Sequence, residues 1–322
     1  FSQASWVDIE TEYHNILCDT AFIDIKPNRK YKYNSVDELN KDFEAVKDLL
    51  EKYLSKVISK KEIKLIEGIK VIIESSFDLK DLTSTGQKNL IDEVTKEVLT
   101  VIYPEILPSD IRGYYTTDMD IMKDRLLSSF LRQPKLKDEY IASVEYSSLN
   151  TFQTLFLNFN YTNLEKLYKK ETDEVIHIHG ELNNPDNPII FGYGDEIGED
   201  YKAIENLNDN KYLENIKSIK YLETTNYNRL LSFIESDEYQ IFVLGHSCGN
   251  SDRTLLNALF EHENCVSIKH YYYQENETKD HFSDTIRNIS RNFNDKRAMR
   301  EKVVNKKDSA PLVPYKKETQ PE

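Results

Sequence analysis

The chain is short of the residues that build several common kinds of protein site. Among its 322 residues it has three cysteines, nine glycines, nine prolines and one tryptophan. Cys18, Cys248 and Cys265 are odd in number and show no Cys-x-x-Cys spacing, which argues against both a disulfide framework and a zinc ribbon. No stretch approaches the roughly 18 consecutive apolar residues that a membrane-spanning helix needs. We therefore expect a globular protein of the reducing cytoplasm that has no membrane partner.

Positive charge is also scarce. Lysine and arginine together number 42 against 56 aspartates and glutamates, for a formal net charge of -14. Affinity for nucleic acid comes largely from Lys and Arg displacing counterions from phosphates, so this balance argues against a nucleic-acid partner. The one basic stretch, residues 287–317, is diluted by carboxylates and is typical of a solvated surface.

Helical patterns dominate the first half of the chain. Ser35 and Glu38 have the spacing of a capping box, which predicts a helix starting there. Apolar residues then recur at three- and four-residue steps from Val36 to Val57, as one stripe of a long amphipathic helix. That stripe fits packing in the core, and the alternative is a partner-binding helix. Further helical patterns cover residues 62–77, 87–102 and 119–131.

We assign residues 26–150 to a large helical insertion. Residues 1–25 read as the start of an α/β domain, with a helix already under way at Trp6. A nucleotide-binding α/β domain normally begins with a strand and a glycine turn, so we expect these two features to lie upstream of Phe1.

The second half changes in character. Short apolar runs bounded by Gly, Pro and Asn favour buried parallel strands, and they cover residues 152–159, 175–178, 189–191, 241–244 and 265–273. Helical patterns lie between and after them, at residues 163–170, 227–236, 253–262 and 278–293. The sequence thus predicts an α/β core over residues 151–305, followed by a mobile tail over residues 306–322.

Four segments that follow apolar runs carry the chemistry-bearing residues. They are residues 158–162, 177–180, 191–194 and 244–247, and six of the nine glycines and six of the seven histidines fall between Glu174 and Phe282. The carboxyl ends of parallel strands meet at one edge of a sheet, where α/β proteins bind their ligands. We expect a site at this edge.

The side chains in the first two segments each have two interpretations. Asn160 suits a turn or helix cap, or an amide that holds a ribose hydroxyl or a water. His177 and His179 share one face of a strand, but further ligands are missing nearby, so no metal site is predicted. His179 precedes Gly180, which allows a sharp turn, and could act as a general base at the sheet edge. His177 fits a structural role better.

The last two segments resemble known motifs only in part. Gly192, Gly194 and Gly198 have the wrong spacing for a dinucleotide fingerprint, so we interpret them as a ligand-facing turn. Residues 245–249 match the Gly-x-Ser-x-Gly nucleophile elbow. A serine hydrolase would use Ser247 with an oxyanion hole near His179 and Gly180. Its acid would be Asp252 or Asp280, paired with His281 as the base. The alternative is a nucleotide-binding turn, with Ser251 or Asp252 capping the next helix.

Taken together, these segments resemble the bacteriophage abortive infection AbiH family, whose sheet is similar to the sirtuin NAD-binding fold. The resemblance rests on residues 6–10, 157–162, 176–180, 190–196, 243–247 and 251–253. It implies a Rossmann-like parallel sheet of sirtuin type with a large helical insertion. It also implies NAD as substrate or ligand, with a phage-derived trigger and a homo-oligomer as partners to test.

The resemblance assigns roles to particular residues. Asn160 and His179 take the positions that handle the nicotinamide ribose in catalysis. The implied cofactor-binding residues are Tyr161, Gly180, Gly192, Gly194, Gly245, His246, Ser247 and Asp252. Three functions stay open from the sequence: an anti-phage protein that hydrolyses NAD, a non-catalytic nucleotide-sensing or interaction module of a defence system, and a serine hydrolase.

Overall fold

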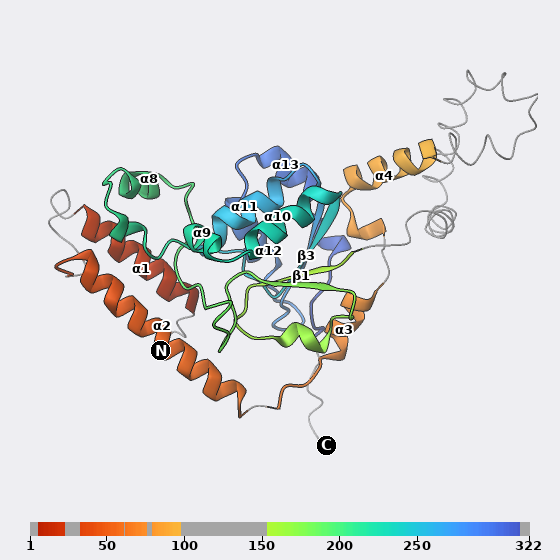
Figure 1. Ribbon diagram of the computed structural model, residues 1–322. Coiled ribbons are helices and arrows are strands. Elements are labelled where there is room, and N and C mark those ends of the chain that lie inside the picture. The colour runs from red at the N-terminus through yellow and green to blue at the C-terminus, as the bar shows by residue number, and fades with distance from the viewer. Residues whose placement is uncertain (1–5, 23–32, 61, 76–78, 98–152, 316–322) are drawn as a thin grey trace, which may run out of the picture.

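The computed structural model describes residues 6–22, 33–60, 62–75, 79–97 and 153–315 (Figure 1). The helix predicted over residues 119–131 and the end of the one predicted over residues 87–102 lie outside these ranges. None of the helices in the described residues is both long enough and apolar enough to cross a membrane.

The described strands form two parallel pairs. β1 (Leu155–Asn158) pairs with β2 (Glu174–His177), and β3 (Tyr239–Leu244) pairs with β4 (Cys265–Tyr271). This confirms an α/β protein with short parallel strands. Instead of one continuous sheet, however, the described strands give two sheets of two strands each. The sirtuin-type order of strands stays a prediction.

Both pairs contribute to one apolar core. Ile176 and Ile178 from the β2 segment lie in the same buried cluster as Val243 of β3 and Ile268 of β4. Four helices pack against this core: α10 (Asn226–Ser236), α11 (Arg253–Glu261), α12 (Phe282–Arg291) and α13 (Lys296–Lys302). Helix α13 was not predicted from the sequence. The predicted helices at residues 227–236 and 253–262 are therefore confirmed.

A second core joins the N-terminal helices to the segment after β2. α1 (Trp6–Ala21) and α2 (Val36–Ile58) run side by side, with the ring of Tyr13 stacked 3.9 Å from that of Phe43 (Figure 1). Phe43 in turn stacks 4.8 Å from Phe191. The apolar stripe of α2 from Val36 to Leu50 is therefore core packing, whereas Tyr53 near its end is exposed.

The first of the two hydrogen bonds expected for the capping box of α2 is confirmed. The backbone N–H of Glu38 donates to Oγ of Ser35 at 3.3 Å, which fixes the first turn. The Glu38 carboxylate reaches back one residue further than the motif requires, and accepts from the N–H of Asn34 at 3.2 Å. These two hydrogen bonds give partners to the backbone N–H groups of Glu38 and Asn34.

Of the two remaining N-terminal helices, α4 (Ser84–Glu97) packs against β4 through Leu90 and Val266. α3 (Glu67–Glu74) falls within the helix predicted over residues 62–77, and α4 begins three residues before the predicted start. The turn before α4 is fastened to β4 by a buried ion pair, Asp81 Oδ1 to Lys269 Nζ at 2.6 Å.

Two predicted elements are wrong. Residues 189–191 form no strand, because this segment returns past the end of β2: the N–H of Ile190 donates to the carbonyl of His179 at 2.9 Å. Residues 163–170 contain only a short 3-10 turn, Leu164–Leu167, since Glu165 turns inward to bind Asn158 and His177. α12 also begins four residues later than the predicted start at residue 278.

The smaller helices bring polar residues to the site. α8 (Glu199–Glu205) lies beside α1, and α9 (Lys217–Lys220) follows it in the chain (Figure 1). At the C-terminal end, residues 306–315 of the predicted tail lie along the extension of β4, where the N–H of Leu312 donates to the carbonyl of Tyr272 at 2.9 Å.

Candidate functional site

A cluster of buried charged and polar side chains lies at the carboxyl ends of β2 and β3. Its members come from five separate segments: Glu10 from α1, His179 from the turn after β2, Lys217 from α9, Tyr221 from the turn after α9, and Asp252 from the start of α11. We call these five residues the His179 cluster. All five are less than a tenth exposed, and charged groups reach such burial only when they are paired.

Lys217 connects the two carboxylates of the cluster. Its Nζ lies 3.0 Å from Oε2 of Glu10 and 2.9 Å from Oδ1 of Asp252, and the residue is 1% exposed. One ammonium group thus neutralises part of the negative charge of two buried carboxyls. This contact also fastens α1 to the strand ends, because Glu10 and Lys217 are 207 residues apart in sequence.

His179 is the imidazole of the cluster. Its Nε2 lies 3.1 Å from Oδ1 of Asp252 and 3.1 Å from the Tyr221 hydroxyl. An ionised carboxylate only accepts hydrogen bonds, so this contact places the proton on Nε2. No described residue hydrogen-bonds to Nδ1, which leaves that nitrogen with a lone pair. The arrangement is that of a histidine oriented by a carboxylate, as general bases often are.

A second histidine and an aromatic ring flank this pair. Nδ1 of His246 accepts from the N–H of Cys248 at 3.0 Å, so its proton sits on Nε2, which lies 3.5 Å from Oδ2 of Asp252. The Phe159 ring stands edge-on to His179, with centroids 5.2 Å apart, and lies 4.2 Å from the His246 ring. The turns after β1, β2 and β3 therefore meet around Asp252.

Gly180 allows the turn that places His179. Its φ of 80° lies in the left-handed region, where a side chain is strained. A Cβ at this position would also lie 2.1 Å from the carbonyl oxygen of Pro188. Only glycine fits here, as the His-Gly sequence predicts, although its role is to let the backbone return beside His179.

The pKa values of the two carboxyl groups in the cluster, those of Asp252 and Glu10, shift in opposite directions. Burial raises the pKa of Asp252, but the charges of Lys217 and His179 outweigh this and hold it well below its usual range. Burial raises the pKa of Glu10 above its ordinary value, with Lys217 opposing the shift. Asp252 is thus the ionised carboxylate that orients His179, while Glu10 takes up a proton more readily. Such separation of paired carboxyls is typical of functional sites.

The low pKa of Asp252 makes the fold sensitive to acid. A depressed folded pKa means that this carboxylate stabilises the fold above its ordinary value of 3.8, and the contribution is lost as the pH falls through the folded pKa. We expect Asp252→Asn to lower the free energy of unfolding most near neutral pH, and progressively less below about pH 4. Chemical denaturation across this range measures the difference, with the exposed Asp186→Asn as control. A deficit independent of pH would contradict the assignment.

Tyr161 lies beside the His179 cluster, whereas the described contacts of Asn160 are with Asn158 and His177. Asn160 is exposed, and its N–H donates to the side chain of Asn158 at 2.8 Å in a local turn. The Tyr161 hydroxyl is buried and donates to the carbonyl of Ile190 at 3.4 Å. Burial, reinforced by the charges of Glu10 and Asp252, raises the pKa of Tyr161 well above its usual value. Tyr161 therefore stays a neutral donor, and the side chain of Asn160 faces solvent.

His177 has a structural environment. Its Nε2 lies 3.3 Å from Oε1 of Glu165 and its Nδ1 lies 3.4 Å from the carbonyl of Asn160. The other carboxylate oxygen of Glu165 accepts from the Asn158 amide at 2.7 Å. These bonds hold the turn after β1 against β2 and leave no ring nitrogen of His177 unpaired.

The predicted glycine turn is closely packed. A Cβ on Gly192 would lie 2.2 Å from the carbonyl oxygen of Asn215, and one on Gly194 would lie 2.8 Å from that of Ser251. Both glycines are buried and bring this segment against the backbone before α9 and α11. Their cofactor-binding role stays a prediction.

The turn after β3 differs from a nucleophile elbow. The left-handed residues are Gly245 (φ 78°) and Cys248 (φ 53°), and Ser247 itself is exposed. Within the described part of the chain no base contacts its hydroxyl. His281 pairs instead with Glu275 at 3.4 Å, and Asp280 with Lys306 at 2.7 Å. A Cβ on Gly245 would meet only Leu312, at 3.8 Å, so this side of the turn is open.

Asp252 does not cap α11 as predicted. It occupies the N-cap position, but its side chain makes no cap hydrogen bond and is drawn instead to Lys217 and His179. Glu10 and Lys217 were missed altogether, since no local motif marks either residue. Only a weak indication of Glu10 was present in the sequence: this residue and His14, four positions later, interrupt the apolar face of α1.

The comparisons with known proteins decide the family. A family model for "Bacteriophage abortive infection AbiH" matches residues 114–274, which is half of the chain. The chain belongs to the AbiH family. Membership assigns it to the abortive-infection defence of bacteria against phages. No curated protein and no solved structure matches the chain.

The AbiH match includes most of the His179 cluster. His179, Lys217, Tyr221 and Asp252 lie within the matched residues. Glu10 precedes them and joins the cluster only through the packing of α1. The family assignment therefore agrees with the resemblance that the sequence segments indicate.

Proposed function

We propose that this AbiH-family chain defends against phage by hydrolysing NAD to nicotinamide and ADP-ribose, with His179 as the general base. One observation carries the proposal: Nε2 of His179 is held by the Asp252 carboxylate at 3.1 Å, and Nδ1 is left without a hydrogen-bond partner among the described residues. This pair lies at the carboxyl ends of the strands, where nucleotide ligands bind in α/β proteins.

The reaction needs a general base and one water molecule, and little else from the protein. A water oxygen forms a bond to C1′ of the nicotinamide ribose while the C1′–N1 bond breaks. The electron pair of that bond returns to the pyridinium ring, so nicotinamide leaves as a neutral molecule and needs no acid. The proton of the water passes to Nδ1 of His179. Asp252, ionised at neutral pH, stabilises the imidazolium that forms.

The surroundings support a nucleotide at this place. Phe159 presents a ring beside His179 and His246 that suits contact with a flat base. The exposed amide of Asn160 lies in the turn after β1, next to β2 in a register that pairs Asn158 with His177. It would hold the ribose hydroxyls or the attacking water.

Incubation of the purified chain with NAD tests the proposal. We expect nicotinamide and ADP-ribose to appear in equal amounts, as measured by liquid chromatography. Thermal stabilisation by NAD without product would favour a nucleotide-sensing module instead. Covalent labelling of Ser247 by a fluorophosphonate probe would favour a serine hydrolase.

A further inference from the structure

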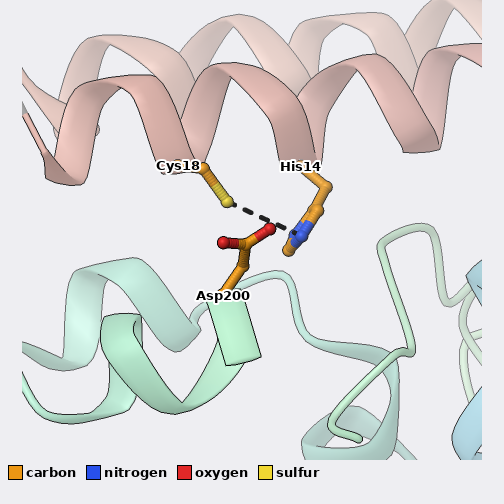
Figure 2. Close-up of side chains that lie close together, drawn as sticks. All are labelled: His14, Cys18 and Asp200. Carbon is orange, nitrogen blue, oxygen red and sulfur yellow. Dashed lines mark hydrogen bonds between the residues drawn. The ribbon is translucent and has the colours of Figure 1, made fainter. Parts of the chain in front are cut away.

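A second cluster of polar side chains lies on the same face of α1, beyond Glu10. His14 and Cys18 follow at intervals of four residues, so all three point to one side of the helix. Figure 2 shows His14 and Cys18 directed toward Asp200 in the first turn of α8. One ligand atom from each of His14, Cys18 and Asp200 lies within 4.8 Å of the other two.

The spacing of the first two groups matches a zinc site. Nε2 of His14 lies 3.6 Å from Sγ of Cys18. A tetrahedral zinc ion with Zn–S of about 2.3 Å and Zn–N of about 2.0–2.1 Å separates these atoms by about 3.6 Å. Asp200 is exposed, so its side chain can rotate to bring the carboxylate closer to the other two ligand atoms, which lie within 4.8 Å of it.

The ring of His14 is buried and held in a fixed orientation. The residue is 9% exposed, and its Nδ1 is buried with no hydrogen-bond partner in the described part of the chain. The ring of Tyr193 stacks on the imidazole, with centroids 3.9 Å apart and planes 11° apart, and so fixes its orientation.

We propose that His14, Cys18 and Asp200 bind a zinc ion, with water in the fourth position. A thiolate, an imidazole and a carboxylate are the ligand types of zinc, whereas magnesium and calcium prefer oxygen alone. Three protein ligands leave an open position, as in zinc sites that bind or activate a small molecule.

The ion would connect this cluster to the His179 cluster. It would clip α8 to α1 and hold Tyr193, whose carbonyl accepts from the N–H of Lys217 at 3.0 Å. His14 and Cys18 precede the residues that the AbiH model matches, so the proposal does not depend on the family assignment. It is also independent of the proposed function, because the test below measures metal and not turnover.

Zinc binding by the full chain tests the site. The protein is freed of metal with a chelator and then titrated with zinc in competition with a chromogenic chelator, with metal content measured by mass spectrometry. We expect one zinc ion per chain. His14→Gln and Cys18→Ser should each weaken binding more than about 100-fold, because even second-shell changes cost 10- to 100-fold. Asp200→Asn should weaken it at least about 10-fold.

Two controls keep the result decisive. Asp19→Asn changes a carboxylate beside Cys18 that lies outside the cluster, and should bind zinc as the parent does. Cobalt in place of zinc should give a thiolate-to-metal charge-transfer band that Cys18→Ser removes. Asp200 is exposed, so Asp200→Asn should fold normally even if a buried variant does not. Parental affinity in Asp200→Asn, or no stoichiometric zinc in the parent, overturns the site and leaves a thiol–imidazole hydrogen bond only.

Discussion

Replacing His179 by alanine is expected to lower the rate of nicotinamide release from NAD by about 100- to 10,000-fold, the usual contribution of a general base. His179 is the imidazole of the cluster that combines a carboxylate at Nε2 with an unbonded Nδ1. The variant loses the base but keeps Asp252 paired with Lys217. Steady-state kinetics by chromatography, at saturating NAD, measures the change in kcat.

His281→Ala is the matched control for that experiment. His281 is a partly exposed histidine that pairs with Glu275, away from the His179 cluster. We expect parental activity from this variant, whereas a serine hydrolase built on Ser247 and His281 would lose it. Undiminished activity in His179→Ala would remove His179 from the chemistry.

Lys217→Met is expected to lower the free energy of unfolding by about 3–5 kcal/mol, the cost of breaking a buried ion pair from one side. Methionine fills a similar volume, so the loss comes mainly from charge. Glu10 and Asp252 would remain buried without the ammonium that both contact within 3.0 Å. Chemical denaturation followed by circular dichroism measures the difference.

Two further variants show whether charge is the cause. Lys202→Met removes an exposed lysine paired with Glu199 at 2.9 Å and should cost less than about 1 kcal/mol. Adding Glu10→Gln to Lys217→Met should restore part of the stability, because one of the unpaired carboxyls is then neutral. A loss in Lys217→Met as small as that in Lys202→Met would mean that the cluster is not held by this ion pair.

Much of the fold was predictable because its signals are local. The Ser35 cap and the apolar stripe of α2 both follow from neighbouring residues, and the strands β1 to β4 follow from short apolar runs. The strand predicted at residues 189–191 was wrong because a short apolar run is buried equally well in an irregular segment that passes the end of a strand. A strand needs a partner along its length, and that property cannot be seen in one short stretch of sequence.

The candidate site was predictable only in part. His179 and Asp252 follow apolar runs and could be chosen as site residues from that position alone. Glu10 and Lys217 could not, because they lie 207 residues apart in sequence and a lone charge in a helix usually faces solvent. His14 and Cys18 were missed for the same reason, since the third member of their cluster comes from α8.

The central claim is that phage defence depends on the reaction at His179. The most direct test measures NAD in bacteria that express the full-length protein, before and after phage infection, for the parent, His179→Ala and His281→Ala. The account predicts that NAD falls and plaques are suppressed with the parent and His281→Ala, while His179→Ala keeps its NAD and is lysed. Suppression of plaques by His179→Ala at parental level, with NAD unchanged, would contradict it.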